Sequence, residues 1–69
     1  IVRVWNADNG VKISNLPIGS MVSVYDAVGH VIASRLAKTS EMHLPIQTGY
    51  YIVHITSETR VITINITIP

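Results

Sequence analysis

The sequence contains no cysteine, and only 13% of its 69 residues are charged. It therefore has no disulfide to stabilise it. Its three histidines, His30, His43 and His54, stand far apart without the paired spacing of zinc sites, so we expect no metal. The five basic residues are spread singly and give no electrostatic footprint for nucleic acid. No run approaches the roughly 18 uninterrupted apolar residues that a membrane span needs.

Catalytic patterns are also lacking, and we expect no enzymatic activity and no cofactor. The four acidic residues, Asp8, Asp26, Glu41 and Glu58, all lie in or beside stretches of turn-forming residues. A glycosidase needs two carboxylates that face each other across a cleft, which a chain of this size can hardly form. There is no Gly-x-Ser-x-Gly elbow and no glycine-rich loop that opens a helix.

Small size limits what the chain can bury. A domain of this length buries only about 60% of the surface that its unfolded chain exposes, so its stability is marginal. Apolar residues make up 48% of the sequence, which is enough for a folded core and argues against disorder. The chain starts at Ile1 inside a strand-like pattern, so we interpret residues 1–69 as a single module of a longer protein.

The most strongly β-prone run is residues 49–56, GYYIVHIT. Side chains alternate across a strand, so Tyr51, Val53 and Ile55 point to one face and the intervening residues to the other. Both faces are largely apolar. We therefore expect this strand inside a packed structure and not at its rim.

Residues 60–68 show the clearest period of two. Ile62, Ile64, Ile66 and Ile68 line one face, and Val61, Thr63, Asn65 and Thr67 line the other, which is typical of a half-buried antiparallel strand. Five further short segments have strand character: 1–5, 11–14, 20–26, 30–38 and 42–44.

About seven short strands joined by Gly, Pro and Asn turns predict an all-β fold, a small antiparallel β-sandwich. A small barrel is the alternative. The predicted core contains Val22, Val24, Tyr51, Val53, Ile55, Ile62, Ile64 and Ile66.

Two turns carry more detailed expectations. Residues 26–29, DAVG, predict a type I turn closed by a glycine bulge. The Asp26 carboxylate would accept hydrogen bonds from turn amides and Gly29 would adopt the left-handed conformation, so this aspartate is structural. In the turn at 15–19, we expect Leu16 and Ile18 to pack beneath the sheets.

Residues 22–32, VSVYDAVGHVI, and 46–55, IQTGYYIVHI, together resemble the C-terminal sorting domain of type IX (Por) secretion cargo in Bacteroidetes. In that family an apolar-x-apolar-Tyr-Asp-x-x-Gly hairpin precedes an apolar-x-x-Gly-x-Tyr-x-Val-x-Ile strand, and a last apolar strand closes the chain. The matching motif positions here are Tyr25, Asp26, Gly29, Gly49 and Tyr51. His30 and the non-basic C-terminus depart from the family pattern.

The resemblance implies a seven-stranded Ig-like sandwich that forms a non-catalytic module at the end of an exported protein. Such a module directs a secreted or cell-surface protein through the periplasm and is recognised by outer-membrane secretion machinery. Its other contacts would be with upstream domains of its own chain. We expect the recognition surface on the last strand, at Arg60, Thr63, Asn65 and Thr67, because a terminal strand offers unpaired backbone groups. The same edge could pair with a second copy as a weak homodimer.

Two other functions are compatible with the same fold. An Ig-like spacer or adhesion module of a cell-surface protein would need no special residues. A carbohydrate-binding module would use exposed aromatic rings, for which Trp5, Tyr25 and Tyr50 are the candidates.

Overall fold

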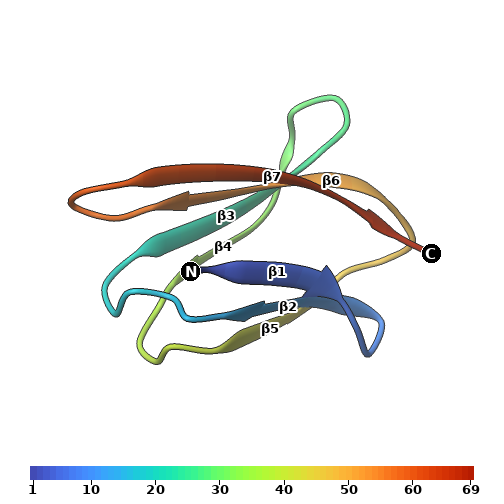
Figure 1. The fold of residues 1–69 in the computed structure, drawn as a ribbon. Helices are drawn as coiled ribbons and strands as arrows, with labels where there is room; N and C mark the ends of the chain where they lie inside the picture. Colours follow the sequence, from blue (N-terminus) through green and yellow to red (C-terminus); the bar gives the residue numbers. More distant parts are fainter.

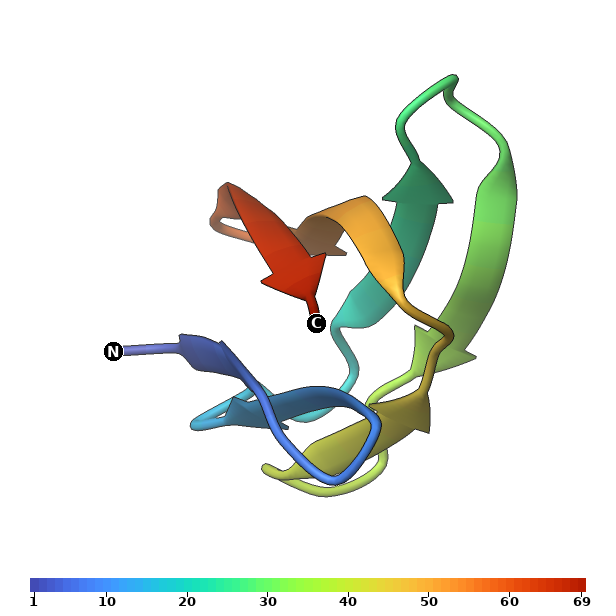
Figure 2. The ribbon, with the colours of Figure 1, turned by 90° about the vertical axis from the view of Figure 1, so that its right-hand side faces the viewer.

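The computed structural model describes residues 1–69 as seven strands in two antiparallel sheets (Figures 1 and 2). The strands are β1 Arg3–Asn6, β2 Gly10–Ser14, β3 Met21–Asp26, β4 Val31–Leu36, β5 Met42–Pro45, β6 Gly49–Thr56 and β7 Val61–Ile68. The sheets face each other as two layers, which confirms the predicted antiparallel sandwich. No helix of the length and hydrophobicity needed to cross a membrane is found.

The smaller sheet has the order β1-β2-β5 and the larger sheet the order β4-β3-β6-β7. In a constant-type immunoglobulin domain the fourth strand joins the sheet of the first, second and fifth strands. Here β4 instead pairs with β3 and extends the larger sheet. As predicted, β6 is an interior strand: Val53 lies opposite Val24 of β3 on one side and Ile64 of β7 on the other.

The core lies between the two layers and is entirely aliphatic apart from one tyrosine. Val22, Val24 and Val53 of the larger sheet are completely buried, as is Val11 of the smaller sheet. The predicted core residues Tyr51, Ile55 and Ile66 are buried as well. The complete core comprises Val11, Ile13, Leu16, Val22, Val24, Ala37, Leu44, Ile46, Tyr51, Val53, Ile55, Ile66 and Ile68.

Three expected core positions are corrected by the structure. Ile62 and Ile64 are only half-buried; Ile62 packs against the core but also lines an open cleft together with Val2 of the other layer. Leu16 is buried as expected, but Ile18 is 74% exposed. The Gly19 amide donates a hydrogen bond to the carbonyl of Ala37, which follows β4, and this bond fixes the turn after Pro17. In this turn the Ile18 side chain projects outward.

A two-residue turn joins β1 to β2. Asp8 and Asn9 both have positive φ, of 51° and 60°, and Ala7 and Gly10 exchange backbone hydrogen bonds of 3.0 and 3.1 Å. This is the geometry of a type I′ turn, whose twist matches that of the paired strands. Aspartate and asparagine tolerate the left-handed conformation better than other side chains do, which explains their presence here.

Gly10 is required for a different reason, which is close approach. A Cβ atom at this position would lie 2.1 Å from the carbonyl oxygen of Leu44, on the paired strand β5. Real Cβ atoms do not occur so close to a backbone oxygen, so any side chain here would push the two strands apart. The loop before β6 is fixed next to this contact, because the Ile46 amide donates to the Asn9 carbonyl at 3.2 Å.

We expect Gly10→Ala to lower the free energy of unfolding by about 2–3 kcal/mol through forced separation of β2 and β5. Gly19→Ala is the matched control, because Gly19 has a φ of 93° but a Cβ there would meet no atom within 4 Å. That control should cost about 1 kcal/mol of left-handed strain. Urea unfolding of both variants provides the measurement, and an equal or larger loss in Gly19→Ala would contradict this account.

Candidate functional site

The turn between β3 and β4 has the form that the sequence predicts. The Asp26 Oδ1 atom accepts hydrogen bonds from the amides of Val28, at 3.0 Å, and His30, at 2.9 Å. Gly29 has a φ of 95°, and its amide donates to the Asp26 carbonyl at 3.1 Å. These bonds give the aspartate a role in closing the hairpin.

The same contacts lower the pKa of the Asp26 carboxyl below its ordinary value. The largest cause is the hydrogen bond from the His30 amide, with a further contribution from the Val28 amide. The His30 ring, whose Nδ1 atom lies 3.3 Å from the carboxylate, favours the charged form when the ring is protonated. The charged carboxylate is thus the form that the turn stabilises.

Tyr51 closes the bend that leads into β6. Its hydroxyl group donates to the Gln47 carbonyl at 2.9 Å, and its side chain is buried. A Cβ atom at Gly49 would lie 3.1–3.2 Å from the tyrosine ring and hydroxyl, so the ring packs directly over the glycine. A buried tyrosine that bonds to the backbone just upstream is the tyrosine corner of Ig-like sandwiches. The Gly49 and Tyr51 motif positions therefore act together.

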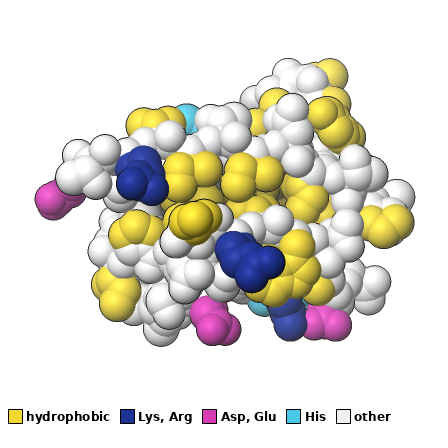
Figure 3. Space-filling model, viewed as in Figure 1, with side chains coloured by type: hydrophobic (Ala, Val, Ile, Leu, Met, Phe, Trp, Pro, Cys, Tyr) yellow, Lys and Arg dark blue, Asp and Glu magenta, His cyan; other side chains and the backbone are white.

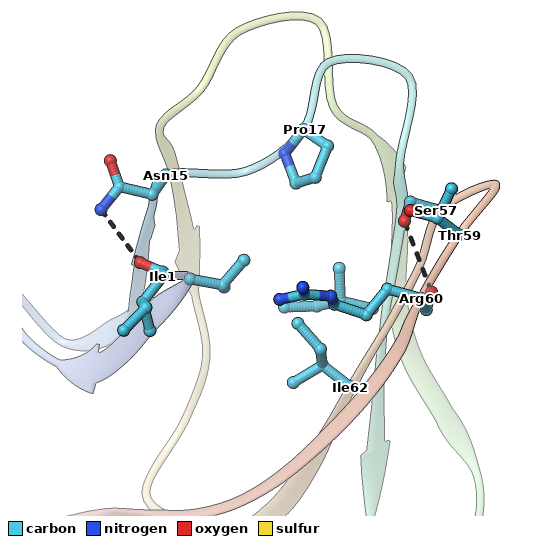
Figure 4. A pocket seen from close by; sticks show the side chains of 9 residues that line it. Ile1, Asn15, Pro17, Ser57, Thr59, Arg60 and Ile62 are labelled. Atoms are coloured by element: carbon cyan, nitrogen blue, oxygen red, sulfur yellow. Dashed lines mark hydrogen bonds between the residues drawn. The ribbon is translucent and has the colours of Figure 1, made fainter.

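The four residues expected to form a recognition surface on β7 are divided between two faces. Thr63, Asn65 and Thr67 point outward from the larger sheet and are exposed. On this face, the Thr63 hydroxyl lies 3.2 Å from His54 Nδ1 of the neighbouring strand. Arg60 immediately precedes β7 and, by alternation, lies on the same face as Ile62. Its side chain points between the sheets (Figure 4).

The outer edge of β7 is free along its first half. β7 pairs only with β6, and no backbone hydrogen bond joins it to β1, which runs beside it in the other sheet (Figure 1). Near the end of the strand, Asn6 Nδ2 of β1 donates to the Thr67 carbonyl at 3.2 Å. This contact closes one end of the seam between the sheets, whereas the other end stays open.

A cleft of about 270 Å³ lies at that open end (Figure 4). Apolar side chains of Val2, Ile55 and Ile62 contribute to its walls, and the Arg60 side chain extends across it toward Ile1. We call it the Arg60 cleft. Its lining residues are Ile1, Val2, Asn15, Pro17, Ile55, Ser57, Thr59, Arg60 and Ile62.

The three histidines lie on separate elements. His30 adjoins the β3–β4 turn, His43 is in β5 of the smaller sheet, and His54 is on the outer face of β6. The His54 ring packs edge-on against Tyr25, with centroids 6.5 Å apart. The structure contains no group of three or more His, Cys, Asp or Glu side chains that could hold a metal ion.

The three aromatic candidates for sugar stacking do not form one platform. Trp5 belongs to β1 of the smaller sheet, whereas Tyr25 and Tyr50 belong to β3 and β6 of the larger sheet. Trp5 is 43% exposed and lies on β1, an edge strand of the smaller sheet.

Comparison with known proteins identifies the fold. No family model matches the chain, and no curated protein matches it. Among solved structures, it is similar to part of PorZ, described as an essential bacterial surface component of the type IX secretion system of Porphyromonas gingivalis. The TM-score is 0.72 at 19% sequence identity, and the match covers 94% of this chain but 11% of the PorZ chain. At this level of identity the likeness establishes a shared fold.

Removal of the tyrosine hydroxyl tests the corner. We expect Tyr51→Phe to lower the free energy of unfolding by about 1 kcal/mol, because the hydrogen bond from the buried Tyr51 side chain to the Gln47 carbonyl is lost. Tyr50→Phe is the control, since Tyr50 is 49% exposed and its hydroxyl has no hydrogen-bond partner in the protein. Urea denaturation of the two variants should separate them, and equal stabilities would argue against the corner.

Acid unfolding tests the turn at Asp26. Because its folded pKa is lowered, its stabilising effect is present above the unfolded pKa of about 3.9 and is lost as the pH falls through the folded pKa. Asp26→Asn should therefore lose less thermal stability than the parent between about pH 5 and pH 2.

The second carboxyl with a lowered pKa is Asp8, chiefly because of its hydrogen bond from Lys12, so Asp8→Asn in both backgrounds isolates the Asp26 contribution. The measurement is the melting temperature across this pH range. If it falls identically with and without Asp26→Asn, the Asp26 carboxylate does not stabilise the turn as described.

Proposed function

We propose that this chain is a non-catalytic sorting module, without a cofactor, that directs an exported protein through the periplasm to the cell surface by type IX secretion. The observation that carries the proposal is the agreement between motif and fold. Tyr25, Asp26 and Gly29 end β3 and form its turn, while Gly49 and Tyr51 begin the adjacent strand β6. The likeness to part of PorZ, a component of such a system, supports it.

As a sorting module, the domain acts by being recognised. Its partners would be the outer-membrane secretion machinery and the upstream domains of the parent protein. The outer face at Thr63, Asn65 and Thr67, together with the free first half of the β7 edge, offers exposed side chains and unpaired backbone groups to a receptor. A receptor strand could pair with this edge. Pairing with a second copy through the same edge would give a weak homodimer.

An Ig-like spacer or adhesion module is the second candidate, and one observation favours it. PorZ is described as a component of the secretion system itself, and the matched segment is 11% of its chain. A fold of this kind within a longer surface protein could serve to separate or join other domains. The division of the aromatic rings between two sheets gives no comparable support to sugar binding.

Export of a fusion tests the sorting proposal. Residues 1–69 are attached to the C-terminus of a periplasmically exported reporter in a host with type IX secretion. We expect delivery of the intact fusion to the cell surface and loss of delivery for Thr63→Lys/Asn65→Lys/Thr67→Lys, which changes the β7 face without altering a core residue.

The matched control carries three lysines on the opposite edge of the same sheet, at the exposed positions Ile32, Ser34 and Leu36 of β4. It should be delivered like the parent. Retention of the intact fusion in the periplasm would defeat the proposal and favour the spacer. Equal delivery of the two lysine variants would remove the recognition role of the β7 face.

A further inference from the structure

We propose that the Arg60 cleft binds an acidic side chain carried by an extended segment of a protein partner. The site goes beyond the sorting role, because an adhesion or spacer module could use it equally. It differs from the outer β7 face, since it lies between the two sheets at the open end of the seam (Figure 4).

The charge of the cleft determines the chemistry of its ligand. Arg60 is its only charged side chain, and no acidic residue lines it. The two ion pairs of the protein join Lys12 to Asp8 and His30 to Asp26, so the Arg60 guanidinium has no carboxylate partner. A guanidinium group beside apolar walls favours a carboxylate, with which it can form two parallel hydrogen bonds.

Both walls of the cleft are held in place by local hydrogen bonds. On the β7 side, the Ser57 amide donates to the Arg60 carbonyl at 2.9 Å and closes the β6–β7 turn. On the β1 side, Asn15 has a φ of 60° and its Nδ2 atom donates to the Ile1 carbonyl at 3.0 Å. The opening is thus formed before any ligand arrives, which reduces the entropic cost of binding.

The surroundings of the cleft favour an extended peptide over a small molecule. The cleft is slightly smaller than the roughly 300–1,000 Å³ of typical small-molecule pockets. Figure 3 shows a band of hydrophobic side chains between β7 and β1. Val2, Val4 and Ile62 of these two segments are half-buried and pack against the core.

The free backbone edge of β7 runs beside this band. A strand paired with that edge would direct alternate side chains toward the cleft, because side chains alternate along a strand. An acidic residue with aliphatic residues two positions before and two positions after it would therefore place its carboxylate near Arg60 and the aliphatic groups along the band. The partner segment is accordingly extended, aliphatic and acidic.

The β4 edge is the competing site for strand addition. β4 pairs only with β3, and its Val31, Ile32 and Leu36 side chains are exposed, with Arg35 between them. If a free strand edge and a nearby cation were sufficient for binding, an acidic peptide would also bind at the β4 edge. The experiment must therefore distinguish Arg60 from Arg35.

A titration followed by ¹H–¹⁵N NMR uses the 69-residue chain, N-acetylated so that the amino group of Ile1 does not act as a second cation. The probes are acetylated and amidated Val-Thr-Glu-Thr-Val peptides with Glu, Gln or Lys at the centre, so that both valines share the face of the central residue. We expect the Glu peptide to shift resonances of Arg60, Ile62 and Ile55, and to bind about three- to five-fold more tightly than the Gln peptide.

Arg60→Glu should reverse the preference and bind the Lys peptide, whereas Arg35→Glu should behave as the parent does. Arg60→Gln, which keeps a polar side chain, should lose the preference for Glu over Gln and serves if Arg60→Glu does not give a dispersed, folded spectrum. These results would support the site.

Three outcomes would overturn it: equal affinity for the Glu and Gln peptides, shifts confined to β4 that Arg35→Glu abolishes, or no shifts at the solubility limit of the peptide. The assay involves no secretion system, so failure of reporter export leaves its result unaffected.

Discussion

The alternation of side chains along β6 is the constraint on which the rest of the structure depends. β6 is hydrogen-bonded on both sides, and Tyr51, Val53 and Ile55 all face the core. A shift of one residue in its pairing would turn these three side chains to solvent and expose the core of a domain that has little apolar area to lose. The tyrosine corner fixes where this strand begins, and the Asp26 turn fixes where its neighbour β3 ends. The motif residues thus determine the register of the larger sheet.

Periodicity and turn chemistry were sufficient to predict the strands, the interior place of β6 and the geometry at Asp26 and Gly29, because each depends on neighbours in sequence. The errors concern the coverage of one sheet by the other. Ile62 and Ile64 follow the same alternation as the buried Ile66, but nothing in residues 60–68 indicates how far the opposite sheet extends. The need for glycine at position 10 likewise arises from Leu44, a residue 34 positions away on a paired strand.

Arg60 illustrates the same limit at the candidate site. The sequence groups it with Thr63, Asn65 and Thr67 because all are polar and close together, yet alternation already places an even-numbered residue on the side of Ile62 and Ile64. What could not be foreseen is the cleft, which requires the start of β1 and the turn at Asn15 to lie opposite the β6–β7 turn. The Asn6–Thr67 hydrogen bond joins β1 to β7 at one end of the seam, and the cleft lies at the other end.

This division separates the residues that build the fold from those available for recognition. Asp26 and Tyr51 use their polar atoms in hydrogen bonds that close turns, and Gly49 packs against the Tyr51 ring. These residues are therefore engaged within the domain and are poorly placed to bind a partner. The Arg60 guanidinium and the side chains of Asn65 and Thr67 make no hydrogen bond within the protein that the fold requires. A receptor that recognised only the motif residues would distinguish a folded domain from an unfolded one, but it would not distinguish one folded domain of this kind from another. One that also contacts the β7 edge and Arg60 would read side chains that can change without loss of the core, and specificity between related domains is most easily encoded there.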